Sequence, residues 1–429
     1  MKYLNRILTA MAISAGFLAV SCEDQPDAFV ATEGVPQIDY IRYVDRDIVI
    51  TQAFMEETVC LVGENLRSVN QLWFNDQEAV LNTSFMTDNT LVASVPQSMA
   101  VVQTDKIYLI TAAQDTVTYD FKVLAPAPVV KSMSNEYAKV GETVTITGQY
   151  FISPITVEMQ GAVVEEKDLT FTETSLSFNI PEGAKPGIVK VTTSSGTTAS
   201  PFHYRDKRGL ITDFDGTTDI VPQGWNFKGE YKSEDGVDGN YVELKSANVL
   251  DESGAWNEDY KIDFWCGNWN GDPMSVTSGP GTPICYVVDF TDFKNMALKF
   301  EICIPKSNPW SSGAMQLIFT NSKNAANDSW QNNTFVHSSA SDPAGLDLCR
   351  GLWRPWETTG EFHTDGKWIT VAVPFSEFIY NSDGTLGKVP LEKPEDFASF
   401  VIWPWSGGVN GKECNPVFRI DNIRAVPVK

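Results

Sequence analysis

Short runs of alternating apolar and polar residues fill the chain from about residue 36 onward, and helical periodicity is nearly absent. In the run 298–304, Leu298 and Phe300 fall on one face, whereas Lys299 and Glu301 fall on the other. A period of two is that of a β-strand with one buried face. Comparable runs lie at 284–290, 315–320, 368–373, 400–403 and 417–423. The pattern therefore predicts an all-β protein whose strands are half-buried.

An internal repeat organises the first half of the chain. Residues 59–66 match residues 144–151, and Pro96 matches Pro181 at the same offset, 181 − 96 = 85 residues. Each copy alternates in short runs broken by Gly, Asn, Asp and Pro, which is typical of a small antiparallel sandwich. We place the copies at 36–125 and 126–205, joined by Ala125-Pro126-Ala127-Pro128, and a third domain at 206–429. Neither copy shows catalytic residues, so both are predicted to be spacers.

The N-terminus has the features of an export signal. Lys2 and Arg6 precede a mostly apolar run that is too short to span a bilayer, which predicts a signal peptide over 1–21. The sequence Ala19-Val20-Ser21-Cys22 resembles a bacterial lipobox, which implies that Cys22 is acylated and becomes the first mature residue. The acids that follow in the tether 22–35 resemble the export signal of surface-exposed Bacteroidetes lipoproteins. An ordinary secretory signal with a chance cysteine is the alternative.

Charge and metal-ligand spacing exclude several classes of function. The formal net charge of −23 argues against nucleic acid and against anionic glycans, because both need a basic surface. The three histidines are scattered and no C-x-x-C motif occurs, so we expect no zinc site and no cofactor. Acids near 213–219 and 235–238 could approach a calcium ion, but solvated acidic turns are the favoured interpretation.

Tryptophan is concentrated in the third domain, which holds eleven of the twelve. Four of these residues stand in polar, turn-rich contexts and are predicted to form an exposed platform for stacking on sugar rings: Trp310, Trp330, Trp353 and Trp356. Polar neighbours that could bind sugar hydroxyls are Arg354, Glu357, Asn332 and Asn333. Core positions are predicted for Trp225, Trp368 and Trp403, and second-choice ligand positions for Trp265, Trp269 and Trp405.

Two resemblances sharpen this picture. Residues 140–148 and 180–187 of the second copy resemble an immunoglobulin-like IPT/TIG domain. Residues 238–244, 366–378 and 418–424 look like the C-terminal domain of surface glycan-binding proteins from Bacteroidetes polysaccharide utilisation loci, close to those for xyloglucan and mixed-linkage β-glucan. The likeness implies tandem Ig-like sandwiches followed by a jelly-roll-like carbohydrate-binding domain.

The same resemblance implies a function and partners. We expect non-catalytic binding of a neutral polysaccharide by a protein anchored by lipid in the outer membrane and facing the exterior. Its implied partners are a TonB-dependent transporter and the lipoprotein lid of that transporter. A surface glycoside hydrolase is one alternative, but the E-x-D-x-x-E run of laminarinase-like enzymes is missing from the sequence. The other alternative is a protein-binding adhesin, because tryptophan-rich loops also bury against proteins.

Overall fold

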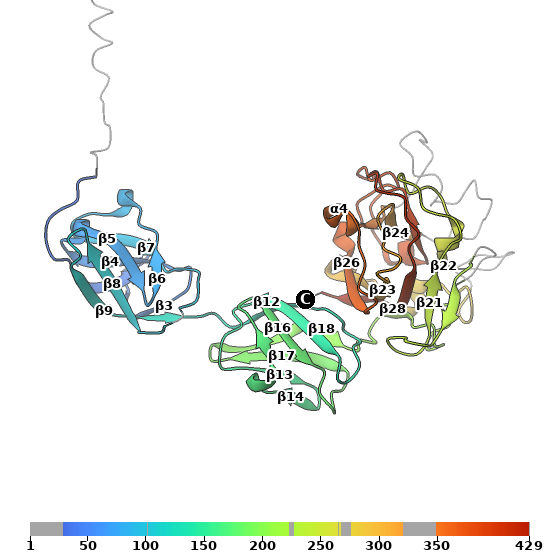
Figure 1. Ribbon diagram of the computed structural model, residues 1–429, viewed down its shortest axis with the longest axis horizontal. Helices are drawn as coiled ribbons and strands as arrows, with labels where there is room; N and C mark the ends of the chain where they lie inside the picture. The colour runs from blue at the N-terminus through green and yellow to red at the C-terminus, as the bar shows by residue number, and fades with distance from the viewer. Residues whose placement is uncertain are drawn as a thin grey trace, which may run out of the picture. The chain divides into compact units, whose positions relative to one another are not determined.

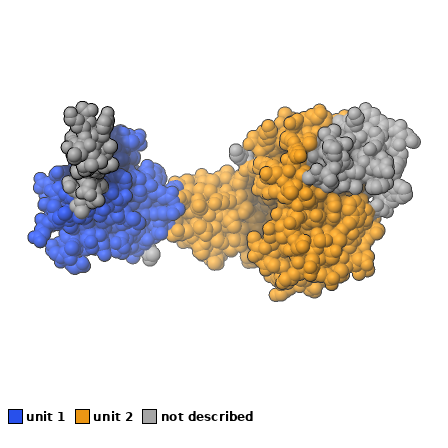
Figure 2. Space-filling view, turned by 90° about the horizontal axis from the view of Figure 1, so that it is seen from above, with its two compact units in different colours: residues 1–126 blue, residues 127–429 orange. Residues whose placement is uncertain are grey.

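A computed structural model describes residues 29–100, 102–222, 227–264, 266, 276–320 and 349–428 (Figure 1). The chain divides into two compact units, Met1–Pro126 and Ala127–Lys429, which Figure 2 colours blue and orange. Each unit is described here by itself. Cys22 and the predicted signal peptide lie outside the described residues. Within the described part of the chain, no helix is long and apolar enough to cross a membrane.

The first unit is a sandwich of two four-stranded antiparallel sheets, with strand orders β2-β1-β4-β7 and β6-β5-β8-β9. A short parallel pair, β3 with β10, lies beside them. The core between the sheets contains apolar residues such as Leu61, Leu72 and Leu109. Its strands are β1 (Gln37–Tyr43), β2 (Val49–Ile50), β3 (Gln52–Phe54), β4 (Thr58–Glu64), β5 (Val69–Phe74), β6 (Gln77–Ala79), β7 (Thr90–Ser94), β8 (Lys106–Thr111), β9 (Thr116–Asp120) and β10 (Lys122–Leu124).

The second unit begins with another such sandwich, with strand orders β11-β12-β16-β15 and β14-β13-β17-β18. Its strands are β11 (Val129–Met133), β12 (Thr143–Gln149), β13 (Ile155–Met159), β14 (Ala162–Val164), β15 (Thr170–Phe171), β16 (Ser175–Asn179), β17 (Gly187–Thr193) and β18 (Gly196–Tyr204).

The repeat seen in the sequence is structural, because β12 corresponds to β4 and β16 to β7. A Cβ atom on Gly63 or on Gly148 would lie 1.9 Å from a backbone carbonyl oxygen of the neighbouring strand. Only glycine permits that approach at both positions.

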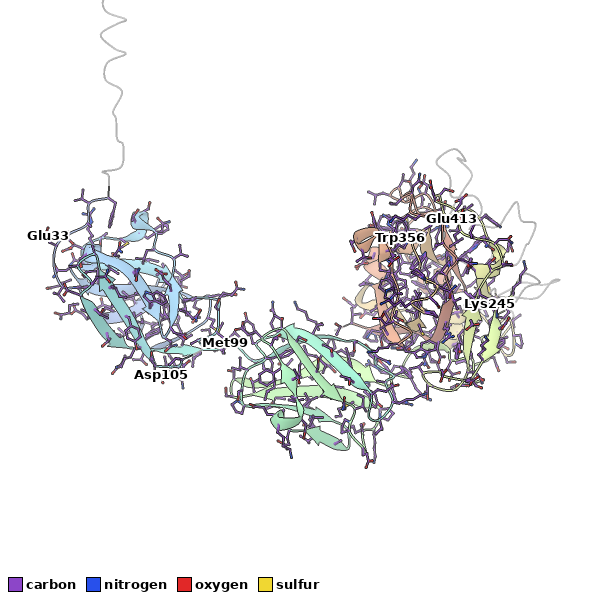
Figure 3. The ribbon with its side chains drawn as sticks, viewed as in Figure 1. Glu33, Met99, Asp105, Lys245, Trp356 and Glu413 are labelled. Atoms are coloured by element: carbon purple, nitrogen blue, oxygen red, sulfur yellow. The ribbon has the colours of Figure 1, made fainter. Side chains whose placement is uncertain are left out.

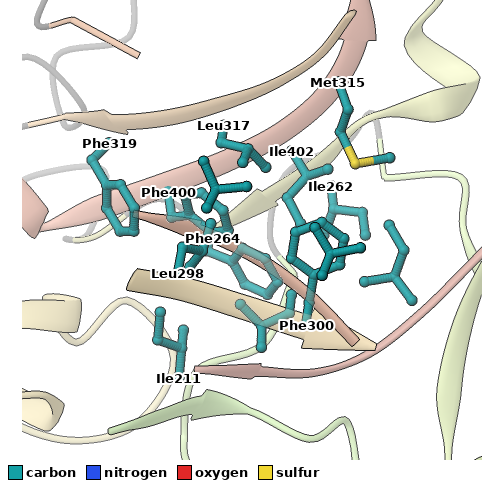
Figure 4. Close-up of a cluster of buried hydrophobic side chains, with 14 of the residues drawn as sticks. Ile211, Ile262, Phe264, Leu298, Phe300, Met315, Leu317, Phe319, Phe400 and Ile402 are labelled. Carbon is teal, nitrogen blue, oxygen red and sulfur yellow. The ribbon is translucent and has the colours of Figure 1, made fainter. Parts of the chain in front are cut away.

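The rest of the second unit is a larger, jelly-roll-like sandwich. One sheet has the order β20-β21-β28-β23-β26 with β19 also paired to β28, and the other has the order β22-β27-β24-β25. Between them lies an apolar core that includes Phe264, Leu298, Phe319 and Phe400 (Figure 4). The strands are β19 (Leu210–Thr212), β20 (Glu230–Lys232), β21 (Tyr241–Leu244), β22 (Ile262–Phe264), β23 (Met296–Cys303), β24 (Ala314–Thr320), β25 (Gly351–Trp353), β26 (Ile369–Pro374), β27 (Ser399–Trp405) and β28 (Phe418–Pro427). The protein is therefore all-β, as predicted.

Two local predictions are wrong. The run 284–290 is not a strand, because α2 (Ile284–Val287) turns as a single helical turn after Pro283. Strand β23 is not half-buried, since all eight of its residues are buried. Its apolar face packs in the core, and its polar face, with Lys299 and Glu301, is covered by the Ig-like domain 127–205.

Strand β28 carries an acid in an unusual setting. Asp421 is fully buried opposite Glu301 of β23. Its Oδ1 accepts a hydrogen bond from the Asn422 backbone N–H at 2.7 Å, while Oδ2 has no hydrogen-bond partner among the described residues. Burial is the main cause that raises the pKa of Asp421 to about 10, and the nearby Glu301 and Asp215 carboxylates raise it further. The side chain is therefore a neutral acid in the folded protein at pH 7.

This pKa predicts a pH dependence of stability. Between pH 4 and the folded pKa of about 10, the folded state holds a proton on Asp421 that the unfolded state releases. The contribution of Asp421 to the free energy of unfolding is present at low pH and is lost as pH rises through this range. Asp421→Asn, which is neutral at every pH, should flatten the decline of stability between pH 5 and pH 8. Urea unfolding followed by tryptophan fluorescence tests this, and parallel pH profiles for both proteins would refute it.

Candidate functional site

The predicted platform residues do not form an exposed surface. Trp310 is completely buried, and its indole N–H donates to the Ser312 carbonyl at 2.6 Å. Trp356, on α4 (Trp356–Thr359), is 4 % exposed and donates to the Gly313 carbonyl at 2.8 Å (Figure 3). The prediction of exposure is wrong for both. The polar turns around them supply backbone carbonyls to the indole N–H, and apolar partners come from elsewhere in the chain.

The other predicted ligand residues have mixed positions. Trp353 on β25 is half-buried, and its ring packs edge-on against Phe300 and Phe362 with centroids 6.0 and 5.6 Å away. Trp330 lies outside the described residues, as do Asn332, Asn333, Trp225, Trp265 and Trp269. Arg354 and Glu357 form an ion pair at 2.6 Å, so each is held by the other.

Three other tryptophans pack together, and one of them is exposed at the surface. We call Trp256, Trp403 and Trp405 the indole cluster. The ring of Trp256 meets that of Trp403 edge-on with centroids 4.0 Å apart, and that of Trp405 at 5.3 Å. Trp256 is 44 % exposed, Trp405 is half-buried and Trp403 is fully buried. The sequence reasoning did not single out Trp256, although its setting in Gly254-Ala255-Trp256-Asn257-Glu258 meets the rule applied to the other tryptophans.

Strand alternation positions the cluster. Along β27, Phe400 and Ile402 point into the sandwich core, so Val401, Trp403 and Trp405 point to the outer face of the four-stranded sheet. Trp403, which was predicted to be core, is thus buried in a separate apolar group with Ile318 on that outer face.

Hydrogen bonds fix the orientation of two of the three rings. The Trp256 indole N–H donates to Glu258 Oε1 at 3.0 Å, and the Trp403 indole N–H donates to the Asn257 carbonyl at 2.9 Å. The first bond lies within the segment 256–258, and the second joins this segment to β27. The exposed part of Trp256 is therefore held in one orientation before any ligand arrives.

Polar side chains on the same sheet face lie beside the indoles. Lys261 Nζ is 5.3 Å from the Trp403 ring centroid, 3.4 Å from Glu258 Oε2 and 4.0 Å from Asp263 Oδ2. Thr320 of β24 is not beside the indoles, because it pairs with Ser399 at the other end of β27.

Gln316 of the same strand contacts the backbone of the indole cluster through its side chain. Its amide nitrogen donates to the Trp405 carbonyl at 2.6 Å, and its oxygen accepts from Arg350 at 2.7 Å. An exposed indole can stack on the apolar face of a sugar ring, and neighbouring ammonium and carboxylate groups can form hydrogen bonds with the hydroxyls of the same ligand.

The acidic turns raised as calcium candidates are occupied by backbone donors. Asp213 Oδ1 accepts from the N–H groups of Asp215 and Thr217, and Asp215 Oδ1 accepts from Asn240. Among the described residues, no group of three or more His, Cys, Asp or Glu is arranged to hold a metal ion.

Comparisons with known proteins identify the families of the two domains in the second unit. The model of the surface glycan-binding protein B xyloglucan-binding domain matches residues 204–427, and the IPT/TIG domain model matches 128–204. The crystal structure of surface glycan-binding protein B from Prevotella bryantii is 35% identical, covers 93% of this chain and 100% of that chain, and superposes with a TM-score of 0.78.

A curated relative is also similar. An IPT/TIG domain-containing protein of Bacteroides ovatus is 25% identical over 279 residues, which cover 58% of this chain and 53% of that protein. The matched region thus spans about half the length of this relative.

The burial of Trp310 leads to a stability prediction. Trp310→Ala should lower the free energy of unfolding by about 3–5 kcal/mol, because it leaves a cavity between Trp353 and Phe418. Trp256→Ala is the matched control, and its exposed side chain should contribute less than about 1 kcal/mol. Urea unfolding of the full chain measures both. Equal losses for the two variants would contradict the distinction between core and surface indoles.

Proposed function

The chain belongs to the surface glycan-binding protein B family, and from this membership we propose that it binds a neutral β-glucan without cleaving it. The proposed ligand is a xyloglucan or a mixed-linkage glucan. The proposed binding site is the exposed side of the indole cluster at Trp256, beside the four-stranded sheet β22-β27-β24-β25. The description of the matching family model, a xyloglucan-binding domain, supports the ligand class.

The single observation that carries the proposal is the exposed, pre-oriented Trp256 ring above Trp403 and Trp405. The C–H face of a pyranose buries apolar area against an indole, while its equatorial hydroxyls need donors and acceptors at the rim. Glu258 and Lys261 supply such groups next to the rings. The acidic composition, with a net charge of −23, disfavours anionic glycans and supports a neutral one.

The acids at the cluster support binding over hydrolysis. Glycoside hydrolysis needs two carboxyl groups facing each other across the scissile bond. Glu258 and Asp263 instead flank a single ammonium group, that of Lys261, at 3.4 and 4.0 Å. Such an arrangement is suited to hydrogen bonding with vicinal hydroxyls.

The cellular setting is part of the proposal. The lipobox-like sequence ending at Cys22 and the acids after it support a lipid-anchored protein on the outside of the outer membrane. There, the two Ig-like domains would act as spacers, and a TonB-dependent transporter with its lipoprotein lid would receive the bound glycan. The alternatives are a surface glycoside hydrolase and an adhesin that buries the same indoles against a protein.

The first test removes the exposed ring. Trp256→Ala in the full chain should weaken binding of xyloglucan or mixed-linkage glucan oligosaccharides at least tenfold, about 1.4 kcal/mol, because stacking area is lost. Isothermal titration calorimetry measures the affinity. Trp73→Ala, a half-buried tryptophan in the first unit, is the control and should leave the affinity unchanged. An unchanged affinity in Trp256→Ala would show that the glycan binds elsewhere.

The anchor has a separate test. Cys22→Ala should release the protein from the membrane fraction of cells, because the thiol that would carry the lipid is gone. Cell fractionation followed by immunoblotting measures the distribution. A conservative change at an adjacent position, Ser21→Ala, should keep the protein in the membrane. Continued membrane association of the Cys22→Ala protein would eliminate the lipoprotein assignment.

A further inference from the structure

Four charged side chains are buried where the Ig-like domain 127–205 meets the jelly-roll-like sandwich. Lys299 and Glu301 of β23 and Arg424 of β28 lie on the outer face of the six-stranded sheet. Glu136 comes from the loop between β11 and β12 of the Ig-like domain. All four are at most 6 % exposed. Two are acids and two are bases, so the group is neutral as a whole.

Glu136 connects the two domains through both of its oxygens. Its Oε1 lies 2.5 Å from Lys299 Nζ, and its Oε2 lies 2.8 Å from Arg424 Nη2. Arg424 also holds Glu301 at 2.7 and 3.0 Å. Separation of the domains would therefore leave Lys299 without its counter-charge. Arg424 would keep only one of its two acidic partners, Glu301. Breaking a buried pair by removal of one partner is costly because the remaining charge has lost its hydration.

Backbone bonds extend the contact to β26. The Glu136 backbone N–H donates to Thr370 Oγ1 at 2.7 Å, and the Thr370 N–H donates to the Ser134 carbonyl at 2.9 Å. Thr370 Oγ1 in turn donates to Glu301 Oε1 at 2.9 Å. One threonine thus ties the loop of the Ig-like domain to the charged group.

The segment that joins the domains is held as well. The Tyr137 hydroxyl donates to the Asp206 carbonyl at 2.6 Å, and Arg205 pairs with Asp238 at 3.0 Å. The loop that carries Asp238 is held by Trp368, whose indole N–H donates to the Asp235 carbonyl at 2.9 Å. The linker Arg205-Asp206-Lys207-Arg208 thus contacts the Ig-like domain through Asp206 and the sandwich through Arg205.

We propose that Glu136 is an interdomain lock that makes residues 127–429 one rigid body. Domains joined by a short linker move relative to each other by default unless their interface holds them. Here the lock covers the outer face of the six-stranded sheet. The glycan site proposed at the exposed Trp256 lies beside the other sheet and does not involve this contact. That position of the glycan site rests on the proposed function, whereas the lock itself does not.

Trypsin reports on the lock in the full chain, because the linker offers Arg205, Lys207 and Arg208 as cleavage sites. Cleavage of a folded protein requires local opening around the site, so its rate measures how often the linker is released. Glu136→Gln keeps the shape of the side chain and removes its charge. It should raise the rate of cleavage at 205–208 at least tenfold. This corresponds to a decrease of about 1.4 kcal/mol in the free energy of opening the linker. Mass spectrometry of the fragments identifies the site.

The matched control is Glu158→Gln, since Glu158 is an exposed acid of the same domain that pairs with Lys190 at 3.5 Å. Its cleavage rate should equal that of the unmodified protein. Lys299→Met, which removes the opposite partner, provides a second variant should Glu136→Gln fail to fold, and it should raise the cleavage rate in the same way. Tryptophan fluorescence confirms folding of each variant.

The outcomes separate the lock from the glycan site. Faster cleavage with unchanged glycan affinity supports the lock, because Glu136 contacts the six-stranded sheet and the indole cluster lies beside the other sheet. Faster cleavage in a protein that binds no glycan also supports the lock and refutes the proposed function alone. Cleavage of both folded variants at the rate of the Glu158→Gln control would overturn the lock.

Discussion

The buried charges of Glu136, Lys299, Glu301 and Arg424 determine how the second unit can be used. Charges taken out of water need partners, and removal of one partner from a buried pair typically costs about 3–5 kcal/mol. Lys299, Glu301 and Arg424 cannot face a closed apolar core, so they lie on the outer face of their sheet. They are buried there because the Ig-like domain supplies Glu136. The sandwich therefore has one outer face occupied by its own chain.

The opposite sheet has a different composition on its outer face. Trp403 and Trp405 alternate with the core residues of β27, and near them are Lys261, which precedes β22, and Asp263 of β22. Aromatic rings with a few polar groups are costly to leave in water but favourable against a ligand with both apolar and polar surface. The outer sides of the two sheets thus differ in chemistry, since ionic groups hold a domain against one sheet and indoles pack together beside the other.

The sequence predicts the strands well, and the exposure of the tryptophans poorly. Strand periodicity is a local property, so β24, β26 and β27 are found close to their predicted ranges. Exposure depends on residues far away in the chain. Trp310 looks exposed among Asn, Pro, Ser and Gly, yet its ring packs on Phe418, more than a hundred residues later. The polar face of β23 was predicted to be exposed and is buried for the same reason, because Glu136, far earlier in the chain, contacts it.

The internal repeat shows why likeness of fold does not settle the role of a domain. In the second copy, the Glu136 carbonyl accepts a hydrogen bond from the Arg205 N–H at 2.8 Å, and in the first copy the Thr51 carbonyl accepts one from Lys122 at 3.0 Å. The two acceptors keep the repeat offset, 136 − 51 = 85 residues, and the two donors are 205 − 122 = 83 residues apart. The backbone is thus used in the same way in both copies, but Thr51 is exposed and carries no charge. A threonine cannot neutralise a lysine and an arginine on a sheet face. The carboxylate at this position therefore lets the second copy neutralise the charged face of the sandwich that follows it, which the Ig-like fold alone does not provide.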